Sequence, residues 1–282
     1  SNIAGGNPEW DVHSVGKEDN EIAVVINRLL DKIWYDSNVD SSYRMVCKDF
    51  IIKGMGAMYT YPDWNADGGL GAVRMKRLPP ESIFIDPNSS LPDASDASSI
   101  VYSDLHTRLN LLQLFPQYAE LIEEAEEDQE YNESTSGKYN RDSISVRGGS
   151  FVGGEQLERV RKYIRWSKVS IPVVIIHDMM TGKTMKLTRA DYEEMKTKGE
   201  YKKYVDTGYI SESVGYQLAI REMCSFGNQL AYDVVLPLDS YPVTVACNEH
   251  NGTPYPNGDV RHAKTPQRML NRTEALIISH TN

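Results

Sequence analysis

The chain has 282 residues, of which 40% are hydrophobic and 25% charged, and these ordinary values exclude a wholly disordered protein. Its formal net charge of −10 argues against a basic domain that binds nucleic acid tightly, because such a domain must neutralise several phosphates. The longest apolar run, residues 171–176, is too short to span a bilayer, and no secretory signal pattern opens the chain. Three cysteines far apart in sequence indicate a reducing compartment, because they form neither a metal pair nor a disulfide framework; they are Cys47, Cys224 and Cys247.

Two helices are predicted near the start of the chain. Apolar residues recur at helical spacing over residues 18–35, and acidic residues occupy the first turn. A second helix is expected over residues 41–53, with Gly54 as its C-terminal stop. Because the connection between them is short, we expect the two helices to pack as a hairpin.

The following residues change to β character. Residues 57–61 and 70–78 are predicted strands on either side of a turn cluster at 65–69. A short strand over 82–85 ends at Asp86-Pro87, and the small polar residues 92–99 predict a loop. This pattern indicates antiparallel hairpins.

An acidic helical segment and a linker come next. Thr107 is a suitable N-cap for a helix over 109–115, which Pro116 interrupts before helix resumes as far as Glu127. Residues 120–133 hold eight acidic and no basic side chains, which is typical of a solvated surface rather than of paired catalytic carboxylates. Residues 134–156 are rich in Ser and Gly and predict a flexible linker.

The second half is predicted to be β-rich, with one short inserted helix. Strands are expected over 159–170, 173–176 and 184–187, an antiparallel pair over 216–222 and 230–236, and another strand over 241–246. Thr188 and Asp191 form a capping pair for a helix that reaches Lys198. A turn-rich loop over 253–258 precedes a final helix that Thr265 caps and Pro266 begins, and the chain is expected to stop inside that helix.

The fold class predicted from these elements is α+β, with an N-terminal helical hairpin and antiparallel β-hairpins. The β-rich part with its inserted helix follows, and a truncated long helix ends the chain. We divide the chain into an N-terminal part at 1–133, the linker at 134–156, the β-rich part at 157–264 and the start of the last helix at 265–282.

Candidate chemistry is sparse in the sequence. Gly182-Lys183-Thr184 resembles the end of a phosphate-binding loop, but His177 stands where that motif needs its first glycine. Strand residues rather than a helix are expected after Thr184, so we interpret these residues as a hairpin turn. No pair of histidines has the i, i+4 spacing of a zinc-binding helix. We therefore expect no catalytic residue, no cofactor and no metal.

Several short signatures follow one another in an order that resembles the portal protein, or head–tail connector, of short-tailed bacteriophages. They are NPEW at 7–10, KDFIIKGMG at 48–56, RLPPESIFIDP at 77–87, DASDA at 93–97, VRKYIRW at 160–166, YPV at 241–243, PYPNGDVR at 254–261 and TPQRMLN at 265–271. The resemblance implies that the chain holds the wing region of such a protein and ends at the start of the stem helix. Positions expected to carry this architecture are Gly54, Gly56, Asp86, Pro87, Pro254, Gly258, Pro266, Gln267 and Asn271.

The resemblance also implies a function and partners. Portals of this family are dodecameric rings of identical subunits at one capsid vertex, assembled in the host bacterial cytoplasm, and they are not enzymes. They contact the major capsid or scaffolding protein, the terminase and the tail adaptor, and double-stranded DNA passes through the channel without sequence-specific binding. No membrane partner is implied, and the isolated fragment is expected to be monomeric.

Two alternatives remain open from the sequence. One is a nucleotide-binding enzyme that uses the turn at Gly182-Lys183-Thr184, which a helix directly after Thr184 would favour. The other is a different virion structural or adaptor protein, which an independent N-terminal domain of two helices and a hairpin would favour.

Overall fold

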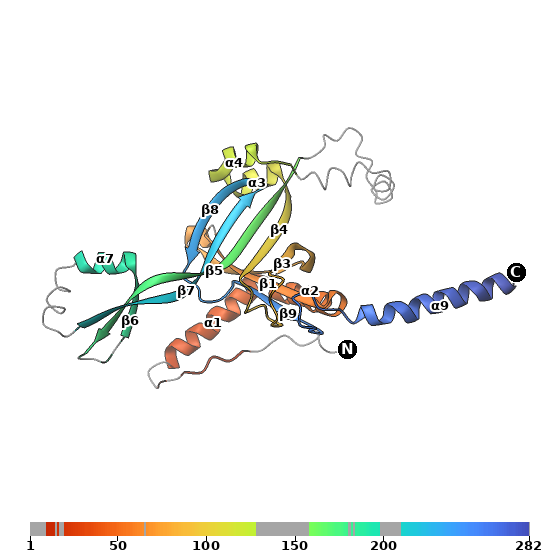
Figure 1. The fold of residues 1–282 in the computed structure, drawn as a ribbon, viewed down its shortest axis with the longest axis horizontal. Helices are drawn as coiled ribbons and strands as arrows, with labels where there is room; N and C mark the ends of the chain where they lie inside the picture. Colours follow the sequence, from red (N-terminus) through yellow and green to blue (C-terminus); the bar gives the residue numbers. More distant parts are fainter. Residues whose placement is uncertain are drawn as a thin grey trace.

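The computed structural model describes residues 10–14, 16, 20–64, 66–127, 158–179, 182, 184–197 and 210–281. Helices and antiparallel sheets are mixed within this part of the chain, and the predicted α+β class is confirmed. Figure 1 shows a central body, an arm formed by β5, β6 and β7, and one long helix, α9, that projects away from the body on the opposite side. The described helices include none that is both long and apolar enough to cross a bilayer.

The two N-terminal helices form as predicted. α1 spans Asn20–Asp36 and α2 spans Val39–Lys53. The Trp34 indole donates a hydrogen bond of 2.8 Å to the Asp40 carboxylate, which fastens the two helices near their connection. The apolar stripe of α1, however, remains largely uncovered. Its members Ile22 and Val25 are each more than half exposed.

The first sheet joins strands from opposite ends of the chain. Its order is β2-β1-β9, in which β1 spans Met55–Asp63, β2 spans Ala72–Leu78 and β9 spans Val243–Cys247. Ala57 pairs with Leu78 on one side and with Val245 on the other. The N-terminal hairpin therefore does not form a separate sheet.

The second sheet has the path β3-β4-β5-β7-β8, with β6 paired to β5 beyond the end of β4. All its pairings are antiparallel. The strands are β3 (Ile83–Ile85), β4 (Ser99–Thr107), β5 (Arg159–Asp178), β6 (Thr184–Thr188), β7 (Ile210–Phe226) and β8 (Gln229–Leu236). Sequence reasoning did not predict β4, which lies between the polar loop and the Thr107 cap.

Residues 159–170 and 173–176 are strand as predicted, but the predicted break between them is wrong, because β5 is one continuous strand of 20 residues. Pro172 lies inside it, where a proline removes one ladder hydrogen bond. The Lys168 N–H points toward β4, as its hydrogen bond to Ser98 shows, so alternation directs position 172 to the same edge. At that edge β4 has ended and β6 has not yet begun, because Ser99 pairs with Ser167 and Thr188 with Val173. The missing N–H therefore has no strand opposite it.

Short capped helices follow β4 and β6. α3 spans Arg108–Leu114, a 3₁₀ turn (η4) covers Pro116–Tyr118, and α4 covers Ala119–Glu124. Both predicted caps are confirmed: Thr107 Oγ1 accepts from the Asn110 N–H, and Thr188 Oγ1 accepts from the Asp191 N–H of α7 (Arg189–Thr197). α4 ends at Glu124, three residues before the predicted end of this helix at Glu127. The linker at 134–156 and residues 128–133 lie outside the described residues, and the division of the chain into domains stays a prediction.

The core lies between the two sheets. Tyr59 of β1 and Trp166 of β5 are in ring contact at a centroid distance of 5.1 Å. Trp166 is fully buried, and its indole donates a 2.6 Å hydrogen bond to Glu222 on β7. Tyr232 on β8 donates to the other oxygen of the same carboxylate at 2.8 Å. Strands from both sides of the linker thus share one core.

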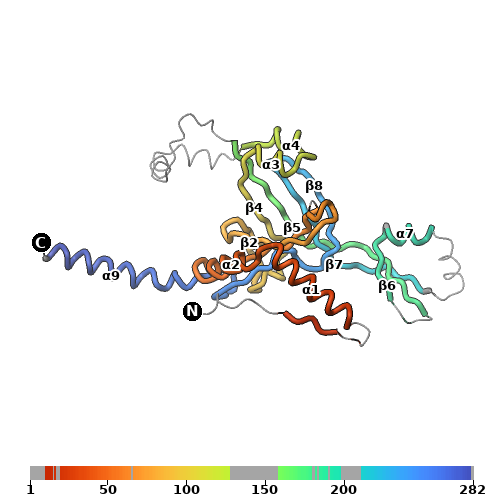
Figure 2. The backbone as a smooth tube through the Cα atoms, turned by 180° about the vertical axis from the view of Figure 1, so that it is seen from behind, coloured from red at the N-terminus to blue at the C-terminus, as the bar shows by residue number. Residues whose placement is uncertain are grey.

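The last helix begins earlier than predicted. α9 spans Val260–Thr281 and contains Pro266 within it, so the prediction that Thr265 caps it and Pro266 begins it is wrong. A proline inside a helix removes one hydrogen bond and leaves an earlier carbonyl without its partner. Residues 259–280 are all exposed, so water can satisfy that carbonyl. Figure 2 shows, from behind, that α9 leaves the body close to α2 and then extends away from it.

Candidate functional site

The base of α9 is held at a junction in which two predicted glycines face each other. Gly54 ends α2 in the left-handed region with φ of 86°, and its N–H donates to the Phe50 carbonyl at 3.1 Å. A β-carbon on Gly54 would lie 2.5 Å from the Asn257 carbonyl carbon, and one on Gly258 would lie 2.6 Å from the Ile52 carbonyl carbon. Neither distance is tolerated by real β-carbons, so both positions require glycine.

Backbone hydrogen bonds close this junction. The Asn248 N–H donates to the Gly54 carbonyl at 2.8 Å, and the Asp259 N–H donates to the Ile51 carbonyl at 2.9 Å. The last carbonyls of a helix have no partner inside that helix, so these two bonds satisfy the end of α2 with groups next to α9. The Asn248 side-chain amide also donates to the Asp259 carboxylate at 2.8 Å.

Gly56 serves a different close approach. A β-carbon there would lie 2.7 Å from a methyl carbon of Val46, so β1 packs directly on the α2 backbone at this point. Of the nine predicted positions, Gly54, Gly56 and Gly258 therefore have a demonstrable steric requirement.

Asp86 and Pro87 begin a loop that is braced by two carboxylates. Asp86 accepts hydrogen bonds from the N–H of Asn88 at 2.9 Å and from the N–H of Ser98 at 3.2 Å. The hydrogen bond from the Ser98 hydroxyl is the main cause that lowers the pKa of Asp86, so this residue is ionised at neutral pH. Asp96 accepts from the Ser89 hydroxyl at 2.6 Å and braces the middle of the loop in the same way.

The loop that contains Pro254 packs on this braced loop. The Tyr255 hydroxyl accepts from the Ile85 N–H at 3.1 Å, and His250 Nε2 lies 2.6 Å from the Ser90 carbonyl oxygen. Pro254 itself is buried. Sequence reasoning missed Tyr255 and His250, because a tyrosine and a histidine in a turn-rich loop carry no local signal of a partner far away in sequence.

Charged groups fasten the other side of the junction. Asp49 of α2 is buried and receives the Arg77 guanidinium at 2.5 Å and the Lys53 ammonium at 2.9 Å. Burial alone would raise the pKa of Asp49, but the hydrogen bonds from Arg77 and Lys53 outweigh it and lower the pKa. Lys53 also binds Glu81 at 2.6 Å. These pairs fix the last turn of α2, and with it the residues that hold α9.

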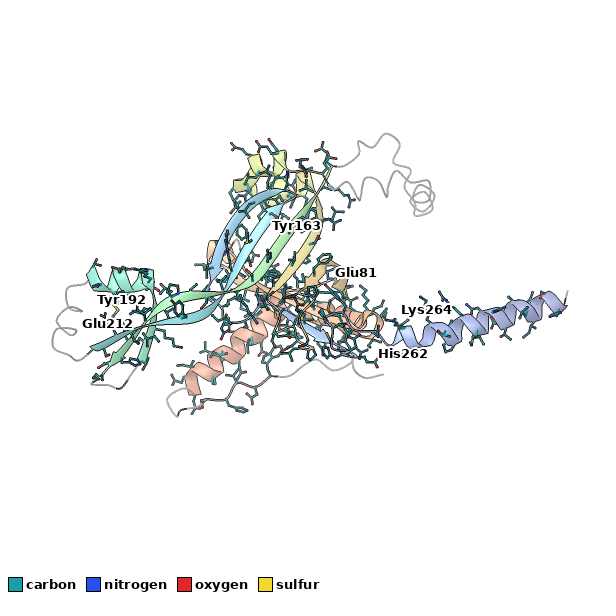
Figure 3. All side chains as sticks on the ribbon, in the orientation of Figure 1. Glu81, Tyr163, Tyr192, Glu212, His262 and Lys264 are labelled. Atoms are coloured by element: carbon teal, nitrogen blue, oxygen red, sulfur yellow. The ribbon has the colours of Figure 1, made fainter. Side chains whose placement is uncertain are left out.

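The remaining predicted residues lie on α9 and not in the junction. Gln267 donates to Asn271 one turn later at 2.9 Å, an exposed pair within the helix. Figure 3 shows His262 and Lys264 just beyond the point where α9 leaves the body. His262 Nε2 is 2.9 Å from the Glu249 carboxylate near the start of the loop after β9, so the first turn of α9 has one further brace.

The alternative sites do not gather catalytic groups. The turn that holds Gly182 connects β5 to β6, and a strand rather than a helix follows Thr184, so the prediction of a hairpin turn is confirmed. Burial raises the pKa of the Cys224 thiol to about 11, which leaves it protonated and a poor nucleophile at neutral pH. Among the residues the structure describes, no group of three metal-ligating side chains forms.

The arrangement is a braced body that presents one long exposed helix, and comparison with known proteins identifies it. A family model described as phage P22-like portal protein matches residues 3–279 of the chain. The chain belongs to this family. No curated protein matches it. Membership in the phage P22-like portal proteins confirms the resemblance drawn from the ordered signatures, several of which form the junction.

Proposed function

We propose that the chain is the wing of a ring-forming portal subunit, and that it contributes to a channel for DNA packaging and ejection at one capsid vertex. Identical subunits would pack around the channel, while capsid or scaffolding protein, terminase and tail adaptor bind the ring. In this role the subunit performs no chemistry. The membership of the P22-like portal family supports the proposal.

The observation that carries the proposal is the uncovered apolar stripe on α9. Met269, Leu270, Leu276 and Ile277 recur at helical spacing, and each is more than half exposed. A helix in a protein gains most of its stability by packing such a face against a partner, whereas an unpacked helix is only marginally stable in water. Within the described part of the chain, α9 meets the body near its base and is exposed beyond it, so a neighbouring copy is the expected cover for the stripe.

Other uncovered apolar groups lie on the body. A pocket of about 320 Å³ opens between α1 and the β1–β2 hairpin, and Leu29, Trp64 and Leu70 are among its lining residues. Trp64 and Leu70 are 74% and 88% exposed. Exposed apolar surface of this kind is typical of an interface between subunits. A ring contact joins two different surfaces of the same chain, so the body and α9 can each contribute one side.

The test is negative-stain electron microscopy of the natural full-length protein that contains this chain. We expect rings with a central channel at least as wide as a DNA duplex, about 20 Å. Compact monomers under several salt conditions would contradict the proposal and would favour the alternative of a virion adaptor protein.

A matched pair of variants tests the role of the stripe. Leu276 lies on it and is 52% exposed, whereas Ile278 lies outside it and is 62% exposed. We expect Leu276→Gln to lower the fraction of rings and Ile278→Gln to leave that fraction unchanged, because only the first removes apolar burial, worth about 1–3 kcal/mol per contact. Equal effects would show that assembly does not use the stripe.

A further inference from the structure

The charge on α9 has the opposite sign to the charge on the whole chain. The chain carries a formal net charge of −10, yet the described helix contains four Lys and Arg residues and a single acidic one, Glu274. The four cations are Arg261, Lys264, Arg268 and Arg272. An acidic protein therefore extends a basic helix into solvent.

These four cations form one row. Their spacing of three or four residues places them on the same face of a helix with 3.6 residues per turn. Leu270 and Ile277, two members of the apolar stripe proposed above to contact a neighbouring copy, lie on the other side of the helix from this row, whereas Leu276 follows Arg272 by one turn and borders it. Packing of the side that carries Leu270 and Ile277 therefore leaves the row of cations accessible to another partner.

The row is exposed, and its members form no ion pair within the described part of the chain. Every residue from 259 to 280 is exposed, and the side-chain hydrogen bond that Arg261 donates within the described chain goes to the neutral Asn257. Glu274, the only acidic residue of α9, lies outside the row. Nothing on the helix therefore neutralises Lys264, Arg268 or Arg272.

We propose that this face of α9, named here the basic row (Arg261, Lys264, Arg268 and Arg272), contacts the phosphates of duplex DNA. The inference rests on the proposed function, because it assumes that DNA passes α9 in the assembled ring. Three of the four cations are arginines, whose planar guanidinium matches a phosphate with two hydrogen bonds. Contacts of this kind carry no sequence information, which suits a channel that admits any sequence.

An acidic surface on a second copy fits the row less well. The described acidic groups of α4 lie within a helix of six residues, which spans about 9 Å. The basic row extends over eleven residue steps, about 16 Å. A duplex offers one negative charge for every 1.7 Å or so of its axis, so it can face the whole row.

The acidic body explains why such contacts need not hold the DNA in place. Four cations per subunit attract phosphate only locally, while the rest of the chain repels it. Binding that depends on phosphate neutralisation is also weakened steeply by salt. The prediction that DNA passes without sequence-specific binding is compatible with this division of charge.

The test measures binding of the full chain to a fluorescently labelled duplex of arbitrary sequence across a salt series. We compare the wild type with Arg268→Gln/Arg272→Gln. The matched control is Arg44→Gln/Lys48→Gln, which removes two exposed cations at the same i, i+4 spacing on α2. All three proteins differ from one another in nothing but surface charge.

We expect binding of the wild type at low salt, and a plot of log K against log salt that is shallower by about 2 for Arg268→Gln/Arg272→Gln. The control, with the same net charge, should keep the wild-type slope. Equal losses in the two variants, or no binding by the wild type at any salt, would overturn the proposal. A change in self-association without a change in DNA binding would assign the row to a protein partner instead.

Ring formation separates this inference from the function on which it rests. Rings that assemble normally with Arg268→Gln/Arg272→Gln but show an unchanged salt slope would overturn the basic row as a DNA contact and leave the portal assignment intact. Failure of every variant and of the wild type to form rings would count against the proposed function itself.

Discussion

Gly54 and Gly258 lie against each other's backbone, and neither position has room for a β-carbon. The first ends α2, and the second precedes α9, so this contact sets where the long helix leaves the body. The contact requires that neither residue has a side chain, so substitution of either glycine by alanine tests it.

Alanine at these glycines should destabilise the protein, because a β-carbon forces the two segments apart. We expect Gly258→Ala to lower the free energy of unfolding by about 2–3 kcal/mol. Gly54→Ala adds the strain of a positive φ to the same clash. The control is Gly252→Ala, which has φ of 78° but nothing within 4 Å of the new β-carbon. In thermal unfolding, Gly252→Ala should have a clearly higher midpoint temperature than Gly54→Ala. Equal decreases in the midpoint would show that the close approach is unimportant.

The Asp49 carboxylate should make the free energy of unfolding decrease as the pH falls in the acid range. Hydrogen bonds from Arg77 and Lys53 lower its pKa in the folded protein. A carboxyl group with a lowered pKa stabilises the fold above its unfolded pKa, near 3.9, and this contribution is lost as pH falls through the folded value. Asp49→Asn should cost about 2–3 kcal/mol at neutral pH and progressively less in acid. Chemical denaturation at a series of pH values measures this, and a constant difference between the two proteins would contradict the prediction.

The buried Glu222 carboxylate accepts from two donors on different strands, Trp166 and Tyr232. Glutamine offers only one acceptor oxygen, so Glu222→Gln should leave one donor without a partner and cost about 1–3 kcal/mol. Tyr232→Phe removes one of the donors. In the Tyr232→Phe background, Glu222→Gln should lower the free energy of unfolding by less than it does in the wild type. A double-mutant cycle of these two substitutions, measured by denaturant unfolding, gives their coupling energy. Strict additivity would show that the two hydrogen bonds act independently.

Arg108 should hold the end of α4 in place. Its guanidinium donates to the carbonyls of Glu123 at 2.7 Å and Ala125 at 3.1 Å, and it binds Glu158 at 2.6 Å. Lysine cannot reproduce this fork, so Arg108→Lys should cost about 1–2 kcal/mol and speed hydrogen exchange within α4. Exchange in α2, far from this site, is the internal reference. Unchanged exchange in α4 would show that the arginine is dispensable.

Local signals predicted much of the fold. The Thr107 and Thr188 caps were correct because a cap depends on residues within one turn of helix. β4 escaped prediction, although Ile100 and Tyr102 alternate as strand residues buried on one face, because it connects a polar loop directly to a helix cap. The prediction divided β5 into two strands at Pro172 for a similar reason. Whether a strand accepts a proline depends on whether another strand lies opposite its missing N–H, which local sequence does not show.

The candidate site was predictable only in part. Gly54 and Gly258 were each predicted as structural positions, but nothing in the sequence around either glycine shows that the two are in contact. Their contact arises from chain segments that are distant in sequence, as does the docking of Tyr255 on Ile85. The start of α9 at Val260 depends on the same junction, which is why Thr265-Pro266 was a misleading local signal.

The pairing of β1 with β9 constrains the order in which a subunit can be completed. Gly56 pairs with Ala246, so one edge of β1 stays open during synthesis until β9, almost 200 residues later, has been made. The segment that closes this edge leads directly into the junction that holds α9. The direction in which α9 leaves the body therefore depends on β9 having closed the first sheet. A chain that stopped before β9 would lack both the strand that closes this sheet and the segment that anchors α9.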